Sequence, residues 1–192
     1  QLEDDLSYRI PLTTHDRRLV VFRRLEDPRD VLQRRPRQVT SASNESFKVW
    51  QDLLTGKGIR KHGLALLAGN KLVPEVLRDL PHVCAELLLA EGHETLPAEM
   101  PADLAVSVLP RKLLAELDVS GTGGPIVVVR APKPQIWDGS VQGCVLAVPF
   151  QDPENVGAVL RTAGALGVEE VVLLRDAASP FHPKALRAGG LA

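Results

Sequence analysis

Residues 144–174 carry a strand–helix–strand pattern whose short connections leave few ways to fold. A continuous apolar run at 144–150 predicts a buried strand, and 171–174 predicts a second strand. Between them, Asp152 followed by proline is typical of a helix start, and Gly167 is typical of a helix end. Strands joined by a helix in this way lie parallel, with a right-handed crossover. The segment is therefore predicted to be a βαβ unit of an α/β fold.

The longer region before it, residues 44–132, alternates helix and strand patterns. Ser43 or Asn44 is suited to cap a helix that carries Phe47 and Trp50 at helical spacing. Further helices are predicted near 71–80 and 110–117, and apolar strands at 64–67, 83–89, 104–109 and 126–129. This alternation predicts a small α/β sandwich with a largely buried sheet.

Two segments flank this predicted sandwich. Residues 133–142 contain prolines and a glycine and are interpreted as a linker to the βαβ unit at 143–192. Residues 1–43 alternate arginine pairs with acids, and contain one short apolar run at 19–22 that is compatible with a strand. This N-terminal arm is compatible with a solvated, mixed-charge segment and also with an RNA-contacting one.

The overall charge does not indicate a nucleic-acid binder, because the formal net charge is −1. Any basic surface must be local, and the clearest candidate is the segment 57–62. It begins at two glycines, Gly56 and Gly58, which are expected to end the preceding helix. Judged by charge alone, this segment is equally well explained as a solvated loop. The residues suited to contact nucleic-acid phosphates are Lys57, Arg60 and Lys61 in this segment, and Lys71 beyond it.

Composition and cysteine usage limit the class of protein to which the chain can belong. With 44% hydrophobic and 24% charged residues, the chain has the balance of a soluble globular protein. Cys84 and Cys144 lie in separate apolar runs, which favours two buried free thiols, and the scattered histidines do not indicate a metal site. No apolar run is long enough for a membrane span, and no secretory segment is recognisable. A cytoplasmic protein is expected.

The predicted helix after Asp152 carries the residues most suggestive of chemistry. Asn155 falls in its first turn, at the carboxyl end of a strand, where ligands bind in open α/β sheets. Gly157 permits a close approach to that turn, and Arg161 lies four residues later on a similar face. Gly164 offers a small-residue packing surface. The pattern alone is equally compatible with a plain amphipathic helix bearing a surface arginine.

These residues resemble a known family. Asn155, Gly157 and Arg161 match the first motif of the SpoU branch of the SPOUT methyltransferases, and 179–188 resembles the stretch that follows its second strand. A serine is usual in that family where Gly189 stands here. Residues 46–69 resemble the family's ribosomal-protein-like RNA-binding domain, although Ala68 replaces an acid found in many relatives. The resemblance covers about residues 44–192.

The resemblance implies transfer of a methyl group from S-adenosylmethionine to the 2′-hydroxyl of a ribose in ribosomal or transfer RNA, by a homodimer with a trefoil knot. Arg161 would help to deprotonate or orient the ribose hydroxyl, and Asn155 would position RNA or the arginine. Because a guanidinium stays protonated at neutral pH, an electrostatic contribution of Arg161 is expected. The expected fold is thus an α/β RNA-binding domain followed by the first part of an α/β-knot methyltransferase domain.

The family's cofactor-binding motifs lie beyond the helix that begins near Pro183, and no residue up to Ala192 is assigned to the cofactor. We therefore expect a fragment that lacks the knot segment and is inactive alone, because nothing in it binds the cofactor. A βαβ unit also leaves wide apolar faces exposed, which likewise indicates an incomplete domain. A non-catalytic RNA-binding relative is the alternative. An unrelated nucleotide-binding α/β protein is disfavoured, because no glycine-rich phosphate motif follows the strand at 144–150.

Overall fold

The computed structural model describes residues 2–9, 16–22, 36–92, 100–101, 103–139 and 143–190, and for 2–9 and 16–22 it describes the backbone alone. The chain divides into two compact units after residue 35. In the first unit, β1 (Leu2–Arg9) pairs antiparallel with β2 (Asp16–Phe22). A strand at 19–22 was predicted, but its partner was not, because the acids of 2–9 hide the apolar alternation of a strand.

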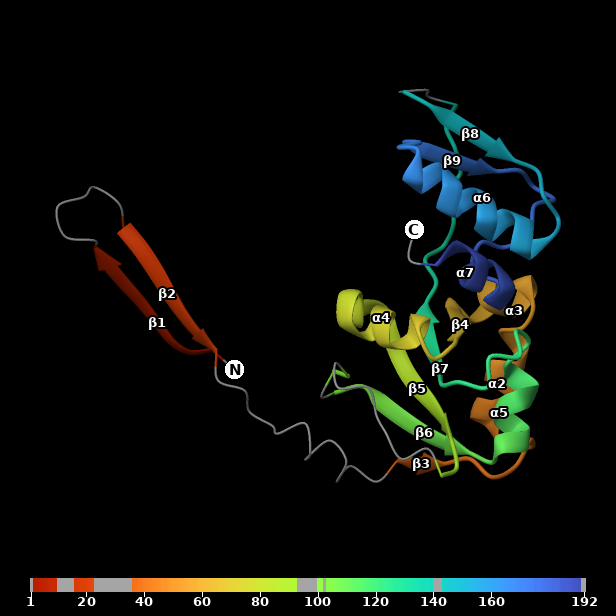
Figure 1. The fold of residues 1–192 in the computed structure, drawn as a ribbon, viewed down its shortest axis with the longest axis horizontal. Coiled ribbons are helices and arrows are strands. Elements are labelled where there is room, and N and C mark those ends of the chain that lie inside the picture. Colours follow the sequence, from red (N-terminus) through yellow and green to blue (C-terminus); the bar gives the residue numbers. More distant parts are fainter. Residues whose placement is uncertain are drawn as a thin grey trace. The chain divides into compact units, whose positions relative to one another are not determined.

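The second unit contains a five-stranded mixed sheet in the order β3-β6-β5-β7-β4 (Figure 1). Strands β3, β6 and β5 are parallel, whereas β7 is antiparallel to both β5 and β4. The strands are β3 (Arg37–Gln38), β4 (Leu64–Ala68), β5 (Cys84–Ala90), β6 (Ala105–Leu109) and β7 (Ile126–Arg130). Thus β3 and the fully buried Val39, which the sequence placed in the N-terminal arm, belong to this sheet and its core.

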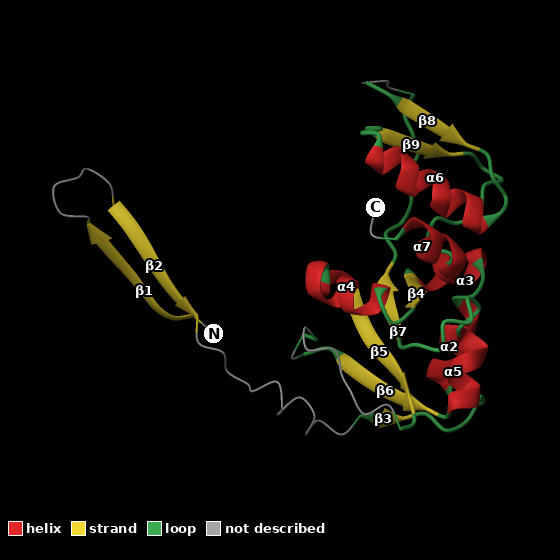
Figure 2. Ribbon diagram, viewed as in Figure 1, coloured by secondary structure: helices red, strands yellow, loops and turns green. Residues whose placement is uncertain are grey.

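Helices cover both faces of this sheet (Figure 2). On one face, Phe47 and Trp50 pack with the leucines of α5 against Leu66 and Leu88. On the other, Val73 and Leu77 belong to a second buried cluster. The helices are α2 (Glu45–Asp52), α3 (Gly56–His62), α4 (Leu72–Asp79) and α5 (Arg111–Leu117), with a short 3-10 turn at Pro81–Val83. The described part of the chain therefore has a mixed α/β fold, as predicted.

The basic segment after Gly56 differs from the sequence expectation, because it forms helix α3 rather than a loop. Thr55 begins this helix, and its side chain accepts a hydrogen bond from the backbone N–H of Gly58. Gly58 is required at this turn, since a Cβ there would lie 1.9 Å from the carbonyl oxygen of Asp52. The glycine therefore allows two helices to follow one another closely instead of marking a loop.

The C-terminal segment has the predicted strand–helix–strand order. Strand β8 (Val145–Val148) pairs parallel with β9 (Glu170–Leu173), and α6 (Pro153–Ala165) connects them. Asp152 caps α6 by accepting a hydrogen bond of 2.8 Å from the N–H of Glu154. The two-stranded sheet leaves large apolar side chains open to solvent, with Phe150 41% and Leu174 48% exposed.

A final helix, α7 (Pro183–Gly189), contacts both α6 and the edge strand β4. Phe181 and Leu186 pack against the core cluster that also contains Val73. Near the C-terminal end of α7, the Arg187 guanidinium donates a hydrogen bond to the carbonyl of Ser120. At the N-terminal end, His182 contacts the backbone of Leu54. Helix α7 therefore joins the βαβ segment to the sandwich at two points.

Candidate functional site

Helix α6 places both predicted catalytic residues at the surface. Asn155 is exposed in the first turn and Arg161 is exposed near the middle of the helix. The Arg161 guanidinium donates a hydrogen bond of 2.8 Å to the carbonyl of Ala188. Arg161 lies six positions after Asn155 in the helix, which corresponds to about 9 Å along the axis. Among the described residues no hydrogen bond joins the two side chains, and the position of Arg161 is fixed by α7.

Gly157 is buried and lets α7 approach α6. A Cβ at this position would lie 2.2 Å from the carbonyl oxygen of Ala185 and 2.9 Å from the Cβ of Ala188. The close approach expected at this glycine is therefore made by the chain's own next helix. Gly164, in contrast, is exposed on α6.

A groove of about 390 Å³ lies next to these residues, where the βαβ segment meets the turn after α5. Glu154, which precedes Asn155, forms an ion pair of 3.5 Å with Lys184, and Ala188 is the residue that binds Arg161. The groove is lined by Val119, Ser120, Glu154, Lys184, Arg187 and Ala188. Lys184 and Arg187 were not among the predicted site residues, although the sequence signal at 179–188 had been recognised.

The structure separates the four lysines and arginines that were expected to bind RNA phosphates. Lys57 and Arg60 are exposed on α3, and no ion pair or hydrogen bond of their side chains is found in the described residues. Lys61 is paired instead with Asp52 at 3.1 Å. Lys71 lies at the opposite end of β4 from α3, roughly 15 Å away for five extended residues.

Asp52 pairs with two basic side chains of α3. Its Oδ2 accepts hydrogen bonds from Lys61 at 3.1 Å and from His62 at 3.0 Å. The pKa of Asp52 lies below its ordinary value. The hydrogen bond from His62 is the largest cause, and the hydrogen bond from Lys61 is the next. Two basic groups of α3 are thus paired with Asp52 at the protein surface, and Lys57 and Arg60 are exposed cations of this helix with no such pair among the described residues.

His182 links the sandwich to α7 in a form that requires a neutral imidazole. Its Nδ1 accepts a hydrogen bond of 3.2 Å from the N–H of Lys184, and the ring also contacts the Leu54 backbone. Burial lowers the pKa of His182, and the nearby Lys184 lowers it further, whereas the Leu54 backbone opposes the decrease. Protonation at Nδ1 would remove the acceptor that caps α7.

The protein is therefore expected to lose stability on mild acidification. A histidine whose pKa is lowered in the folded state contributes stability that is present above its unfolded pKa, about 6.5, and that is lost as pH falls through the folded value. Tm measured between pH 7.5 and 5.5 should decrease less in His182→Asn, since asparagine can cap α7 without titrating. His82→Asn, at an exposed histidine, should retain the wild-type decrease. Equal decreases in all three proteins would contradict this role of His182.

The cysteines differ from expectation at one position. Cys84 is buried, and burial raises the pKa of its thiol, but Cys144 is exposed because it precedes β8 at the open end of the two-stranded sheet. Within the described ranges, no three His, Cys, Asp or Glu side chains are grouped in a way that could bind a metal ion. Every helix in those ranges is too short or too polar to span a membrane.

The amino-acid sequence is similar to those of RNA methyltransferases. The model of the SpoU rRNA methylase family matches residues 143–191. The "Ribosomal RNA small subunit methyltransferase G 2" of Syntrophobacter fumaroxidans is 43% identical over 97% of this chain and 39% of its own length. The "23S rRNA (guanosine(2553)-2′-O)-methyltransferase RlmP" of Bacillus subtilis is 29% identical over 79% of this chain and 60% of its own length.

Solved structures agree in fold. The SpoU methyltransferase AviRb from Streptomyces viridochromogenes, in complex with AdoMet, has a TM-score of 0.62 at 25% identity and matches 77% of this chain. A TrmH-family RNA methyltransferase from Porphyromonas gingivalis, described as putative, has a TM-score of 0.57 at 26% identity, also over 77%. A crystal structure of an RNA 2′-O ribose methyltransferase has a TM-score of 0.58 at 25% identity.

The matches share one further property. The chain spans 39% and 60% of the length of the two curated relatives, and 60% and 58% of the AviRb and P. gingivalis chains. Residues 143–191 therefore match the SpoU methylase family, and the chain as a whole is similar to part of the length of SpoU and TrmH-family RNA methyltransferases.

Proposed function

We propose that this chain is part of an S-adenosylmethionine-dependent enzyme that methylates the ribose 2′-hydroxyl of ribosomal or transfer RNA. Residues 44–132 bind the RNA substrate, and residues 143–192 begin the methyltransferase domain of a homodimer. The observation that carries the proposal is the exposed Arg161, fixed at 2.8 Å on Ala188 within the segment that matches the SpoU family.

Arg161 contributes an oriented positive charge in this proposal. Its guanidinium stays protonated at neutral pH, so it stabilises the developing alkoxide of the ribose and binds the neighbouring phosphate through its planar fork. The bond to Ala188 uses Nη1 and orients the group before RNA arrives. Asn155, exposed in the first turn of α6, supplies an amide that positions the RNA, since Arg161 is already oriented by Ala188.

The described residues do not by themselves fit the cofactor. A ligand of this size is bound in a cavity that encloses most of its surface. At the carboxyl ends of β8 and β9, however, Phe150 is 41% and Leu174 48% exposed, and the described sheet there has two strands. We therefore assign no residue of this chain to the cofactor, and we propose that its binding motifs follow Ala192 in the gene.

RNA phosphates contact the sandwich through outward-facing cations in this proposal. Lys57 and Arg60 on α3 are exposed, and Gly56 of the same helix lies next to Ser179 of the βαβ segment, with 3.7 Å between the Cβ position at Gly56 and the Cβ of Ser179. RNA bound at α3 would therefore also reach the segment that leads into α7. Lys61 contributes less, because Asp52 neutralises it.

A methyl-transfer assay on the complete protein tests the proposal. With labelled S-adenosylmethionine, we expect label on the ribose of one nucleotide in ribosomal or transfer RNA, and no label when that nucleotide is 2′-deoxy. The two curated relatives are named for a small-subunit rRNA and for 23S rRNA, so both rRNAs and tRNA belong in the assay. Label on a base would refute the proposal. RNA binding without any transfer, with no cofactor motif encoded after Ala192, would establish a non-catalytic relative.

A further inference from the structure

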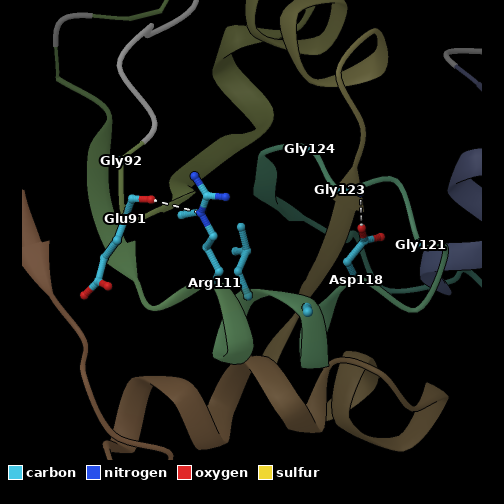
Figure 3. A pocket seen from close by; sticks show the side chains of 10 residues that line it. Glu91, Gly92, Arg111, Asp118, Gly121, Gly123 and Gly124 are labelled. Carbon is cyan, nitrogen blue, oxygen red and sulfur yellow. Dashed lines mark hydrogen bonds between the residues drawn. The ribbon is translucent and has the colours of Figure 1, made fainter.

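A second cavity, of about 490 Å³, lies at one edge of the five-stranded sheet (Figure 3). It is formed where β5 and β6 end, beside the start of α5 and the turn that leads into β7. In sheets with parallel strands, this carboxyl-end edge is where ligands usually bind. The volume is within the range of small-ligand sites, roughly 300–1,000 Å³. The cavity lies outside the groove beside Arg161 described above.

Arg111 presents its guanidinium at this cavity. Its Nε donates to the carbonyl of Glu91 at 3.5 Å, whereas its terminal nitrogens have no hydrogen-bond partner among the described residues (Figure 3). Gly92 lies beside them, and a Cβ there would be in ordinary van der Waals contact with Nη2, at 3.7 Å. In Figure 3 the carboxylate of Glu91 points away from the guanidinium. The free pair of terminal nitrogens matches the geometry that arginine uses to bind a phosphate.

The opposite wall is a glycine-rich turn fixed by Asp118. Oδ2 of Asp118 accepts hydrogen bonds from Thr122 Oγ1 at 2.9 Å and from the Gly123 N–H at 2.8 Å. Gly121 and Gly123 have φ of +61° and +64°, and no atom of the described residues lies within 4 Å of a Cβ at either. Oδ1 of Asp118 is shielded from solvent and has no partner in the part of the chain that the structure describes. This wall therefore exposes glycine backbone, and Asp118, which also lines it, has an Oδ1 that lacks a hydrogen-bond donor in the described residues.

The same turn is connected to the candidate catalytic residue. Ser120 accepts the hydrogen bond from Arg187, and the next residue of α7, Ala188, accepts the one from Arg161. The cavity and Arg161 are thus linked through adjacent residues of one helix end. Lys71, which follows β4 and is 88% exposed, lies beyond the same carboxyl edge of the sheet. Asn70, next to it, contacts Gly124 of the turn, since a Cβ at Gly124 would lie 2.6 Å from Asn70 Oδ1.

We infer that this cavity binds one nucleotide of a single-stranded RNA segment, with its phosphodiester on Arg111 and its nucleoside against the glycine turn. The inference deepens, and rests on, the proposed RNA methyltransferase function. A nucleotide bound here would place the RNA at the end of α7 where Arg161 is fixed. Bare glycine backbone suits a flat base or ribose, which a Cβ would displace.

RNA binding by the complete protein, measured against salt, tests this site. Each phosphate contact contributes about one unit to the slope of log affinity against log salt. Arg111→Gln should weaken binding about 3- to 10-fold and reduce that slope by about one. Lys112→Gln removes the same charge from the neighbouring exposed residue, which does not line the cavity, and should bind like the wild type. Arg111→Lys should restore the slope but not the full affinity.

A second variant tests the space rather than the charge. Ala115 is an exposed α5 residue that lines the cavity, so Ala115→Met should fill the cavity without unfolding the helix. It should weaken RNA binding with the salt slope unchanged. Melting temperatures of all variants should match that of the wild type. Wild-type affinity in both Arg111→Gln and Ala115→Met would overturn the site.

Two further results distinguish an RNA site from a free-nucleotide site, and failure of this inference from failure of the proposed function. Adenosine monophosphate should compete with RNA only weakly, because it offers a single phosphate contact. Saturation at micromolar concentration, with RNA binding unaffected, would show a free-nucleotide site and overturn the RNA assignment. If the wild type methylates RNA but the Arg111 and Ala115 variants do so normally, this inference alone fails. If the wild type neither binds nor methylates RNA, the proposed function fails.

Discussion

Replacing Arg161 with alanine in the complete protein is expected to reduce methyl transfer to RNA by about 100- to 1,000-fold, the usual effect of removing one group that stabilises an oxyanion. The side chain is exposed, and within the described ranges its one hydrogen bond goes to the Ala188 carbonyl. Loss of that bond should lower the free energy of unfolding by only about 1 kcal/mol. The variant should therefore lose most of its methyl transfer while it keeps most of its stability. Single-turnover kinetics measures the first quantity, and thermal unfolding measures the second.

Two variants show whether this loss comes from the charge or from packing. Arg161→Lys keeps the charge but loses the planar fork, so turnover should lie between those of the wild type and Arg161→Ala. Arg175→Ala removes an exposed arginine after β9 and should leave turnover within a few-fold of normal. Near-normal turnover in Arg161→Ala would refute the assignment. So would a loss of turnover that follows a loss of folded protein.

Much of the fold was predictable because local signals agreed with the final structure. Asp152 and the proline after it start α6, and Asn44 caps α2 by accepting a hydrogen bond of 2.9 Å from the Ser46 N–H. Apolar runs placed β4, β7 and β8 within one or two residues of their observed bounds. In the two helices a buried face and a capping residue favour the same element, and each strand is marked by a continuous apolar run, so the sequence pattern is sufficient.

The elements that were not predicted depend on long-range contacts. Strand β3 has two residues and forms by pairing with β6, and Arg37 within it contacts Ser107, Ser46 and Glu86. No short-range pattern marks such a strand. Helix α3 was missed because two glycines suggested a break, whereas Gly58 permits contact with the preceding helix.

The candidate site was partly predictable for a related reason. The motif identified Asn155 and Arg161, but their surroundings are built by residues distant in sequence. Arg187 meets Ser120 across 67 positions, and Arg161 meets Ala188 across 27. The expectation that Lys61 faces RNA ignored Asp52, which lies nine positions earlier and pairs with it once α2 and α3 fold back on one another. Charge patterns along a sequence do not show which cations are already neutralised.

Substituting Gly157 with alanine is expected to destabilise the protein by about 3 kcal/mol. The added Cβ would lie 2.2 Å from the carbonyl oxygen of Ala185, and this oxygen belongs to the backbone of α7, so it cannot move aside as a side chain does. Helix α7 must instead shift away from α6, and the carbonyl of Ala188 then moves relative to Arg161. Thermal or denaturant unfolding of the complete protein measures the first effect, and methyl transfer by the fraction that remains folded measures the second.

Gly164→Ala is the matched control, because it makes the same substitution on the same helix at an exposed position. Alanine has a higher helix propensity than glycine, so this variant should be unchanged or more stable by about 0.5 kcal/mol. The difference between the two variants isolates the packing of α6 on α7 from the intrinsic effect of removing a glycine. If Gly157→Ala were as stable as Gly164→Ala, the two helices would not be in the contact described, and the hydrogen bond that Arg161 donates to the Ala188 carbonyl could not orient Arg161. Because the position of the arginine depends on that contact, Gly157 is expected to affect turnover without touching the RNA.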